Sequence, residues 1–454
     1  MDDWWIEPMR KVFGGRDVVL AGAMAASWTE HIELLRSVGV TNLLVVATEG
    51  RGAGQAPDVQ TVIVEPPTGL SQMEQIHFGD HTLADPPAVV VDALDRFDPD
   101  RRALVIGTFL ATVADLAGRP LVAHRRPEWV ALEDKVVVDA FWDRAGIERQ
   151  RSSIVDLADA PRAATGVDRG EGTVWAADAR DGFHGGANQT YWVTDDDSRE
   201  RALSGLRPVC DRVRVMPFIE GIPCSIHGIV LPDGVATLRP VEMVTLRRST
   251  GLVYSGCATY WDPAPAIREQ MRAVARKAGR LLADEVDFRG TFTVDGVATS
   301  DGFWPTEVNP RFGAGIMTIA RGSGLPMVMI NDLIVGGHDL GCTAVELEAE
   351  VVEHADALRG GGTWRGGLQH DLDVVGRPLS FDESHGWSWA EPGAEIAGRV
   401  TAGSGFVRCI YEPAVTPTGP STGRLATAFW DFIGRETGAD TLGLTAALDR
   451  AAGV

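Results

Sequence analysis

Short apolar runs alternate with stretches of helical spacing along the N-terminal third of the chain. The strand-like runs are residues 17–22, 42–47, 61–64, 88–91 and 103–106. Residues 28–38 lie between the first two runs and place apolar side chains at helical spacing. Strands separated by helical stretches indicate a parallel sheet with helices on its faces. The pattern therefore predicts a Rossmann-like α/β domain over residues 1–125.

The centre and end of the chain follow a different pattern, with more strands and one long helix. Strands are expected at residues 173–176, 191–193 and 213–216, and helices at residues 136–145, 264–284 and 423–437. In the second of these helices the apolar residues share one face: Ile267, Met271, Val274, Ala278, Leu281 and Leu282. Between the last two helices, short strands, hairpins and loops are expected. The whole pattern predicts a mixed α/β and α+β protein.

A predicted hairpin near residue 300 carries the most distinctive polar residues. Residues two apart on a strand point to the same face, so Glu307 and Asn309 project together. The Asp301-Gly302 turn folds the preceding strand back alongside, which brings Asp295 close to Glu307. Two carboxylates and one amide oxygen on one side of a sheet suit a hard cation such as Mg²⁺. Arg311 follows at once and can bind a phosphate or carboxylate in a bidentate way.

An ordinary surface hairpin with solvated acids is the alternative interpretation. The run Glu307-Val-Asn309-Pro-Arg311 argues against it, because neither asparagine nor proline favours a central strand.

Gly290-x-x-x-x-Asp295 followed by Glu307-Val-Asn309-Pro-Arg311 resembles the metal-binding strands of the ATP-grasp superfamily. These enzymes join a carboxylate to an amine through an acyl phosphate. The resemblance extends over roughly residues 126–340 and implies ATP and Mg²⁺ as cofactors. It also implies that Asp295, Glu307 and Asn309 hold Mg²⁺, and that Arg311 faces phosphate or substrate as a catalytic residue.

Two further segments resemble the phosphate-binding parts of this superfamily. Lys135 matches a lysine that reaches the ATP phosphates as a point charge, and a solvated surface lysine is the alternative. Gly185 and Gly186 belong to a glycine-rich loop that folds over the triphosphate in the family. His184 beside them either reaches a phosphate or is solvated. The strand before this loop lacks the second phosphate lysine of the superfamily, and Arg180 or the loop amides are the candidates to replace it.

The strand at residues 213–216 leads into a bend that resembles the adenine hinge of the superfamily. Backbone groups hold adenine there beside apolar side chains, a role that fits Met216, Phe218 and Ile219. Glu220 is placed to accept the ribose hydroxyls. A core strand followed by a turn is the alternative interpretation of the same residues.

Composition narrows the classes of partner. The chain has 454 residues and a net charge of −21, which argues against nucleic acid as a partner. The five cysteines are scattered without a Cys-x-x-Cys pair, so neither a zinc site nor a disulfide framework is expected. The N-terminus lacks the features of a secretory signal, and no apolar run reaches membrane-spanning length. We expect a soluble cytoplasmic protein whose oligomeric state is open, with a homodimer as one option.

The C-terminal segment extends the resemblance to one branch of the superfamily. Residues 218–228, together with the hairpins and loops of the last segment, resemble the pheganomycin-type peptide ligases of actinobacteria. The resemblance implies an α/β domain over 1–125, an ATP-grasp nucleotide-binding and catalytic region over 126–340, and a small mixed, substrate-related domain over 341–454.

The function implied is an ATP-dependent ligase of natural-product biosynthesis. It would form an amide or peptide bond between a small carboxylic acid and an amine, such as an amino acid or peptide, and release ADP and phosphate. A small-molecule phosphotransferase and a nucleotide-binding regulator with a degenerate site are the alternatives. The missing second lysine motivates the regulator.

Overall fold

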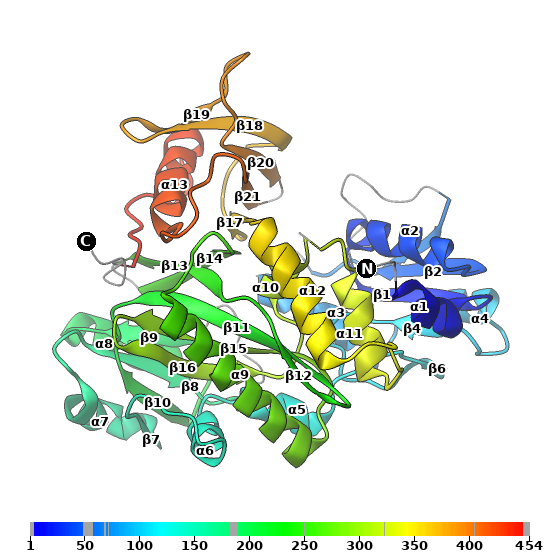
Figure 1. The fold of residues 1–454 in the computed structure, drawn as a ribbon, viewed down its shortest axis with the longest axis horizontal. Helices are drawn as coiled ribbons and strands as arrows, with labels where there is room; N and C mark the ends of the chain where they lie inside the picture. Colours follow the sequence, from blue (N-terminus) through cyan, green and yellow to red (C-terminus); the bar gives the residue numbers. More distant parts are fainter. Residues whose placement is uncertain are drawn as a thin grey trace.

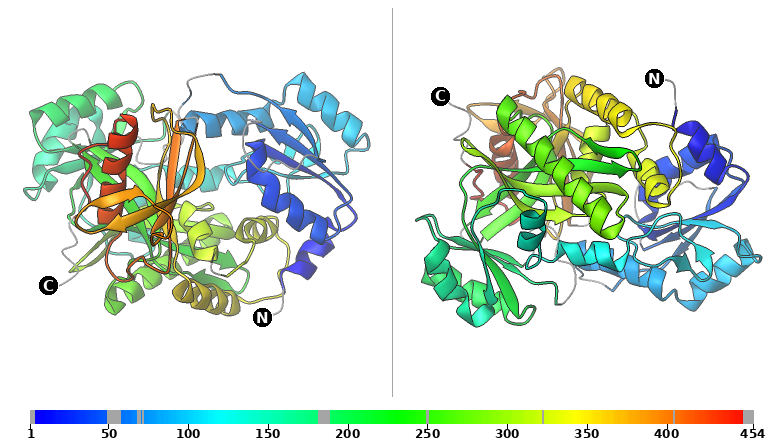
Figure 2. Two further views of the ribbon diagram at one scale, coloured as in Figure 1. Left: turned by 90° about the horizontal axis from the view of Figure 1, so that it is seen from above. Right: turned by 60° about the horizontal axis from the view of Figure 1, so that its bottom comes forward.

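In the described part of the chain, three sheets have four or more strands, and Figure 1 shows how they are arranged. The computed structural model describes residues 4–48, 58–67, 70, 72–180, 189–248, 251–321, 323–403 and 405–447. The N-terminal unit lies to one side of the central strands in Figure 1 and in both views of Figure 2. The C-terminal strands and their helix lie above the central sheet in Figure 1.

The N-terminal unit is a parallel four-stranded sheet with helices on both faces. In sheet order its strands are β3 (Gln60–Ile63), β2 (Asn42–Ala47), β1 (Asp17–Ala23) and β4 (Leu104–Ile106). Its helices are α1 (Ile6–Phe13), η1 (Ala25–Trp28), α2 (Thr29–Ser37), α3 (Gln72–Ala84) and α4 (Ala88–Phe97). Val18 and Leu20 of β1 pack with α1 and α2, whereas Val19 and Ala21 pack with α3 and α4. The predicted parallel sheet is confirmed.

The apolar run 88–91 is not the predicted strand but the beginning of α4. The strand prediction was wrong because apolar residues continue at helical spacing, and Val90, Ala93 and Leu94 are buried. Pro87 stands at the N-cap, where its missing N–H removes no helical hydrogen bond. A short apolar run by itself does not distinguish a strand from a buried helix.

The chain reaches the second sheet through short elements. These are β5 (Asp115–Leu116), β6 (Arg119–Pro120), α5 (Pro127–Val130), η2 (Ala131–Glu133) and α6 (Val138–Arg144). The second sheet is antiparallel, in the order β7 (Ser153–Asp156), β10 (Arg212–Pro217), β8 (Thr173–Ala177) and β9 (Thr190–Val193). η3 (Leu157–Asp159), α7 (Ala160–Val167) and α8 (Asp196–Leu206) follow its strands. α7 and α8 cover the face that buries Trp175, Val213 and Val215, so Ala176 and Arg214 point to the other face.

The third sheet is the largest and runs from the predicted hairpin to the C-terminal strands. Its order is β16 (Gly302–Asn309), β15 (Gly290–Thr299), β11 (Ile222–Leu231), β13 (Val241–Arg248), β14 (Gly251–Ala258), β17 (Gly361–Arg365), β21 (Phe406–Tyr411), β20 (Gly398–Gly403), β18 (Val374–Asp382) and β19 (Gly386–Trp389), with β12 (Gly234–Thr237) beside β11. Its helices are α9 (Pro265–Val286), α10 (Ala314–Ala320), α11 (Met327–Val335), α12 (Ala344–Ala357) and α13 (Gly423–Thr437). Because β17 pairs with β14, the C-terminal strands continue the central sheet.

The C-terminal helix α13 is fixed to the central strands by buried polar contacts. Glu242 on β13 accepts hydrogen bonds at 2.8 Å from both the backbone N–H and the hydroxyl of Thr422, the N-cap of α13. Trp430 on α13 donates its indole N–H to the hydroxyl of Thr363 on β17 at 2.8 Å. None of the helices in the described ranges is both long and apolar enough to cross a membrane.

Candidate active site

The two carboxylates expected to lie together do so across the β15–β16 hairpin. Asp295 and Glu307 are directly paired in the antiparallel register, next to an irregularity in the ladder. Asn309 Nδ2 donates to Asp295 Oδ2 at 2.9 Å and to Glu307 Oε1 at 3.4 Å. The turn at Ser300 and Asp301 pairs Thr299 with Gly302 and Gly296 with Pro305, and the irregularity at Thr306 then shifts the register by one residue, so that Asp295 meets Glu307. The hairpin therefore gathers two carboxylates and one amide.

Lys135 joins this pair from the turn between η2 and α6. It forms an ion pair with Glu307, and its side chain is only 13% exposed. Burial lowers the pKa of Lys135 to about 8, while the charges of Asp295 and Glu133 oppose that shift. Burial also raises the pKa of Asp295. The ammonium and the carboxylates thus share a desolvated cluster in which each charge depends on its neighbours.

A second buried carboxylate, Glu133, connects Arg311 to Arg125. Arg311 Nε donates to Glu133 Oε2 at 3.2 Å, and Arg125 pairs with the other oxygen of Glu133. The Glu133 and Arg125 side chains are 2% and 8% exposed. Arg311 Nη2 also donates to Asn309 Oδ1 at 3.4 Å. Neither Arg125 nor Glu133 was predicted, because both lie outside the recognised motif and only the fold brings them to Arg311.

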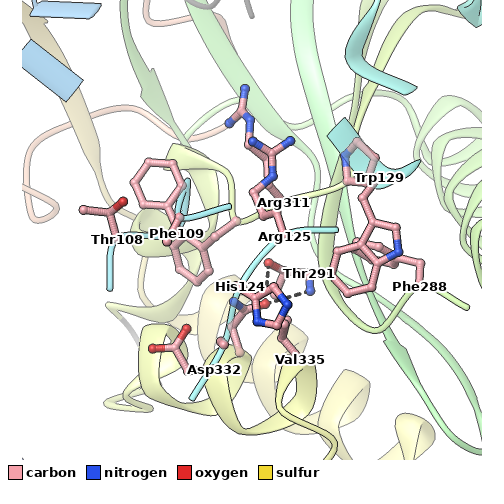
Figure 3. A pocket seen from close by; sticks show the side chains of 15 residues that line it. Thr108, Phe109, His124, Arg125, Trp129, Phe288, Thr291, Arg311, Asp332 and Val335 are labelled. Atoms are coloured by element: carbon pink, nitrogen blue, oxygen red, sulfur yellow. Dashed lines mark hydrogen bonds between the residues drawn. The ribbon is translucent and has the colours of Figure 1, made fainter. Parts of the chain in front are cut away.

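Arg125 and Arg311 also line a pocket at the junction of the N-terminal unit and the third sheet, shown in Figure 3. Thr108 and Phe109 enter it from the segment after β4, and Asp332 enters it from α11. The two guanidinium groups lie toward one end of the pocket in Figure 3, and Asp332 lies toward the other. The cavity between the lining side chains has a volume of about 20 Å³, which is room for roughly one water molecule.

Asp332 is a buried acid with no ion-pair partner in the part of the chain that the structure describes. The residue is 6% exposed, and its side chain hydrogen bonds with that of Asn331. Burial raises the pKa of Asp332 to about 8. The carboxyl group therefore keeps its proton at neutral pH unless a cation comes close to it.

The predicted hinge residues lie at the end of β10 and beyond it. Met216 projects from the face of the second sheet that α7 and α8 leave uncovered. Phe218 stacks on Trp192, with ring centroids 4.3 Å apart. Arg247 lies 5.0 Å from the Phe218 ring centroid and donates to both carboxylate oxygens of Glu220, at 2.7 and 2.8 Å. Glu220, expected to accept ribose hydroxyls, is thus held by a guanidinium.

Phe218, Ile219 and Glu220 line a cleft of about 600 Å³ together with the 299–301 turn and Trp304. We call Asp295, Glu307, Asn309, Lys135 and Arg311 the hairpin cluster, and none of its members lines this cleft. The structure brings the predicted metal, lysine and arginine residues together and places these hinge residues on a separate cleft.

The glycine-rich loop prediction falls outside the described residues. His184, Gly185 and Gly186 belong to the part of the chain between residues 180 and 189 that is not described. Arg180, one candidate to replace the missing lysine, pairs with Asp211 at 2.8 Å.

Arg214 places a further guanidinium beside the hairpin cluster. It is the cross-strand neighbour of Ala176, on the strand where the second lysine was expected. Arg214 Nη1 donates to the Thr306 carbonyl at 2.6 Å, and Nη2 pairs with Asp139 at 2.6 Å. Thr306 directly precedes Glu307. The fold therefore brings the Arg214 guanidinium near the hairpin carboxylates, although these residues are far apart in the sequence.

The chemistry of the hairpin cluster fits a hard divalent cation. Asp295, Glu307 and Asn309 offer oxygen ligands of the kind that Mg²⁺ prefers, once the Asn309 amide presents its oxygen. Across the described ranges, no group of three or more His, Cys, Asp and Glu side chains is arranged to hold a metal. Asp295, Glu307 and Asn309 do not form such a group, because only two of the three are acids and the third is an amide.

Comparisons with known proteins identify the fold. The sequence matches no protein-family model, and it matches none of the curated proteins. Among solved structures, biotin carboxylase from Campylobacter jejuni aligns with a TM-score of 0.56 and 12% identity, over 94% of this chain and 93% of that one. Phosphoribosylamine–glycine ligase from Thermotoga maritima aligns with a TM-score of 0.52 and 14% identity, over 96% and 99%.

A third similar structure is Rhizobium etli pyruvate carboxylase, with a TM-score of 0.56 and 13% identity. It covers 95% of this chain, which spans only 38% of the carboxylase chain. At such identities the likeness shows a shared fold. The chain has the ATP-grasp fold behind an N-terminal α/β domain, so the predicted fold class is confirmed.

Replacing Asp332 by asparagine should stabilise the protein more at about pH 8 than at about pH 5. The folded-state pKa is raised to about 8, so the native state keeps a proton that the unfolded state has lost. The free energy of unfolding therefore falls as pH rises between the two pKa values, by at most ~1.4 kcal/mol per pH unit. Asparagine lacks this penalty. Thermal melts at both pH values measure the difference in stability between variant and wild type. Asp85→Asn, at an exposed position, is the control. An equal effect at both pH values would contradict the assignment.

Proposed function

We propose that the protein is an ATP-dependent carboxylate–amine ligase that works through an acyl phosphate and releases ADP and phosphate. The observation that carries this proposal is the hairpin cluster itself. Two carboxylates, an amide, an ammonium and a guanidinium converge at one end of β15 and β16. This set suits phosphoryl transfer, in which catalysis is chiefly positioning and charge stabilisation. The similar glycine ligase from Thermotoga maritima supports the ligase class by its name.

Each residue of the cluster has a proposed role. Asp295, Glu307 and Asn309 would hold Mg²⁺, which would neutralise negative charge that develops on the phosphate. Lys135 presents a compact positive charge to phosphate oxygens, in place of its present partner Glu307. Arg311 orients the carboxylate, because its planar guanidinium can bind both oxygens at once.

The nucleotide base is assigned to the hinge. Met216, Phe218 and Ile219 offer apolar contact, and the stacked Trp192–Phe218 pair makes that wall rigid. Glu220 reaches ribose hydroxyls only if it leaves Arg247 or shares its oxygens with it. His184, Gly185 and Gly186 stay assigned to the loop that covers the phosphates.

The finer proposals concern domains and substrates. We assign nucleotide binding and catalysis to residues 126–340 and substrate selection to residues 341–454. The substrates proposed are a small carboxylic acid and an amine, either an amino acid or a peptide, with peptide-bond formation in natural-product biosynthesis as the subtype. The resemblance of residues 218–228 to pheganomycin-type ligases supports that subtype.

Glu307→Gln should lower the turnover rate by ~10²-fold or more, while the protein stays folded. The variant removes a charged metal ligand but keeps the side-chain shape. The matched control is Glu285→Gln, which removes an ion-paired carboxylate from the Arg144–Glu285 pair at the surface. ATP- and Mg²⁺-dependent ADP release measures turnover, and circular dichroism checks the fold. Near-native activity of Glu307→Gln would refute the metal assignment.

Lys135→Ala should weaken ATP binding by about tenfold or more, since a hydrogen bond to a charged group is lost. Lys277→Ala should not, although its ammonium donates to the Gly146 carbonyl at 2.7 Å, because that lysine is on the exposed face of α9. Calorimetric titration with ATP and Mg²⁺ compares the two variants. Equal affinities of the two variants would contradict the ranking of Lys135 above Lys277.

Oxygen transfer separates the proposed chemistry from its alternatives. With an ¹⁸O-labelled carboxylate substrate, ligation through an acyl phosphate moves one label into inorganic phosphate. Hydroxylamine should trap the intermediate as a hydroxamate when the amine is absent. Label in AMP would indicate an adenylating ligase, and a stable phosphorylated product would indicate a phosphotransferase. Tight ATP binding without turnover for any acid–amine pair would indicate a regulator.

A further inference from the structure

We propose that the face of the third sheet beside the hairpin cluster binds the amine substrate, and that this substrate is a short peptide whose free carboxylate pairs with Arg321 and Arg408. The inference rests on the proposed ligase function and names the amine substrate of that same site. Three features support it: two guanidinium groups without an acidic partner, a sheet face that continues from them to Asp295, and a distance along this face that suits a peptide.

Arg321 and Arg408 carry two positive charges that no acid in the described ranges neutralises. Arg321 is the C-cap residue of α10, and Arg408 lies on β21. Both residues are exposed, and neither side chain forms an ion pair or a hydrogen bond with another described residue. Although Arg408 is exposed, neighbouring protein atoms desolvate its guanidinium and lower its pKa, and the charge of Arg321 lowers that pKa further. Like charges held within reach of each other favour an anionic ligand.

The side chain of Arg321 runs from α10 toward the third sheet. Arg321 follows Thr318 by three residues, so the two share one side of the helix. Thr318 Oγ1 lies 3.2 Å from Cys257 Sγ on β14, and Arg321 Cδ lies 4.0 Å from the point that a Cβ of Gly360 would occupy, just before β17. The C-terminal end of a helix favours a cation, which accounts for Arg321. It does not account for Arg408, which is on a strand.

One face of the third sheet connects these arginines to the hairpin cluster. Cross-strand pairs and the period of two place the following residues on that face: Asp295, Ser225, Val241, Met243, Cys257, Gly362, Trp364 and Arg408. Helices α9 and α13 cover the opposite face. On the connecting face, α10 packs at Val241 and Cys257, whereas Tyr254 and Trp364 are only half-buried.

Tyr254 and Trp364 form the surface between the two ends of this face. The Tyr254 side chain hydrogen bonds with that of Cys257, and burial, with the charges of Cys257 and Asp295, raises its pKa. Trp364 is directly opposite Arg408 in the ladder of β17 and β21. The Tyr254 and Trp364 rings meet edge to face, with centroids 6.2 Å apart. Because both are half-buried, they offer apolar surface to the body of a ligand whose charged end is at Arg408.

The sheet order provides a measure of how long that ligand is. β15 and β21 are separated by β11, β13, β14 and β17. At ~4.8 Å for each step between strands, the path along the sheet is about 24 Å. The side chains and the transferred phosphate cover part of this path and leave roughly 10 Å, the span of about three extended residues. A single α-amino acid has its amino and carboxylate groups on one carbon, so it cannot reach both ends.

The test compares ligands that differ in length and in one charge. The first series is phenylalanine, the tripeptide Ala-Ala-Phe and Ala-Ala-Phe-amide, and a second series replaces phenylalanine by leucine. Inorganic phosphate is the further probe, because a general anion site would bind it as well. Binding to the whole protein is measured by calorimetry without ATP, so the result does not depend on turnover.

We expect the tripeptide of at least one series to bind about tenfold or more tightly than both its amide and the free amino acid. Arg321→Gln and Arg408→Gln should each remove the preference for the carboxylate over the amide. Trp364→Ala should weaken the tripeptide and its amide alike. Arg435→Gln, which changes an exposed arginine on α13 at the opposite face, should alter neither affinity.

Four results would overturn the proposal. They are equal binding of tripeptide and amide by the wild type, a preference that survives in both arginine variants, an amino acid or phosphate that binds as tightly as the tripeptide, and no binding of either tripeptide at millimolar concentration.

Failure of this inference and failure of the ligase proposal give different results. If the protein is not a ligase, the tripeptide still shows the Arg408-dependent preference but no ¹⁸O reaches phosphate. If only the peptide assignment is wrong, ATP binding keeps its dependence on Lys135 while the preference for the carboxylate is absent.

Discussion

The buried carboxylate of Glu133 is the contact on which the arrangement of the site depends. It holds Arg125, which follows the N-terminal sheet, and Arg311, which follows the β15–β16 hairpin, on its two oxygens. Removing one partner of a buried charge group leaves the others uncompensated, so all three positions are mutually constrained. The contact therefore connects the N-terminal unit to the β15–β16 hairpin. It also keeps two guanidinium groups at the same place despite their repulsion.

A second layer of organisation comes from the third sheet. The hairpin that carries Asp295 and Glu307 is at one end of this sheet, and strands from the C-terminal segment are at the other. Glu242 on β13 connects this sheet to α13, because its carboxylate accepts hydrogen bonds from the N-cap residue Thr422. Site and C-terminal segment are thus parts of one hydrogen-bonded framework.

Local rules predicted the parts of the structure that local interactions determine. The Asp301-Gly302 signal predicted the hairpin and the nearness of Asp295 to Glu307, whereas their direct pairing also depends on an irregularity at Thr306 that the sequence pattern does not show. Helical spacing predicted α9 and α13 in the same way. The 88–91 run was assigned wrongly because its length fits a strand and a helix equally well.

Contacts between distant segments could not be predicted in this way. Arg311 and Glu133 are 178 residues apart, and no periodicity connects them. The same is true of Arg247, which binds Glu220 across strands and changes what that acid can do. Asp332 looks like an ordinary helical acid until the fold buries it, with no ion-pair partner among the described residues.

The pairing of β17 with β14 has a consequence for how the chain can be divided. A protein that ended before β17 would leave β14 with a free row of N–H and C=O groups at the edge of a large sheet. Such an edge is a template for another chain, so the shortened protein would tend to self-associate and not remain a smaller version of itself. The last segment therefore also covers the β14 edge of this sheet.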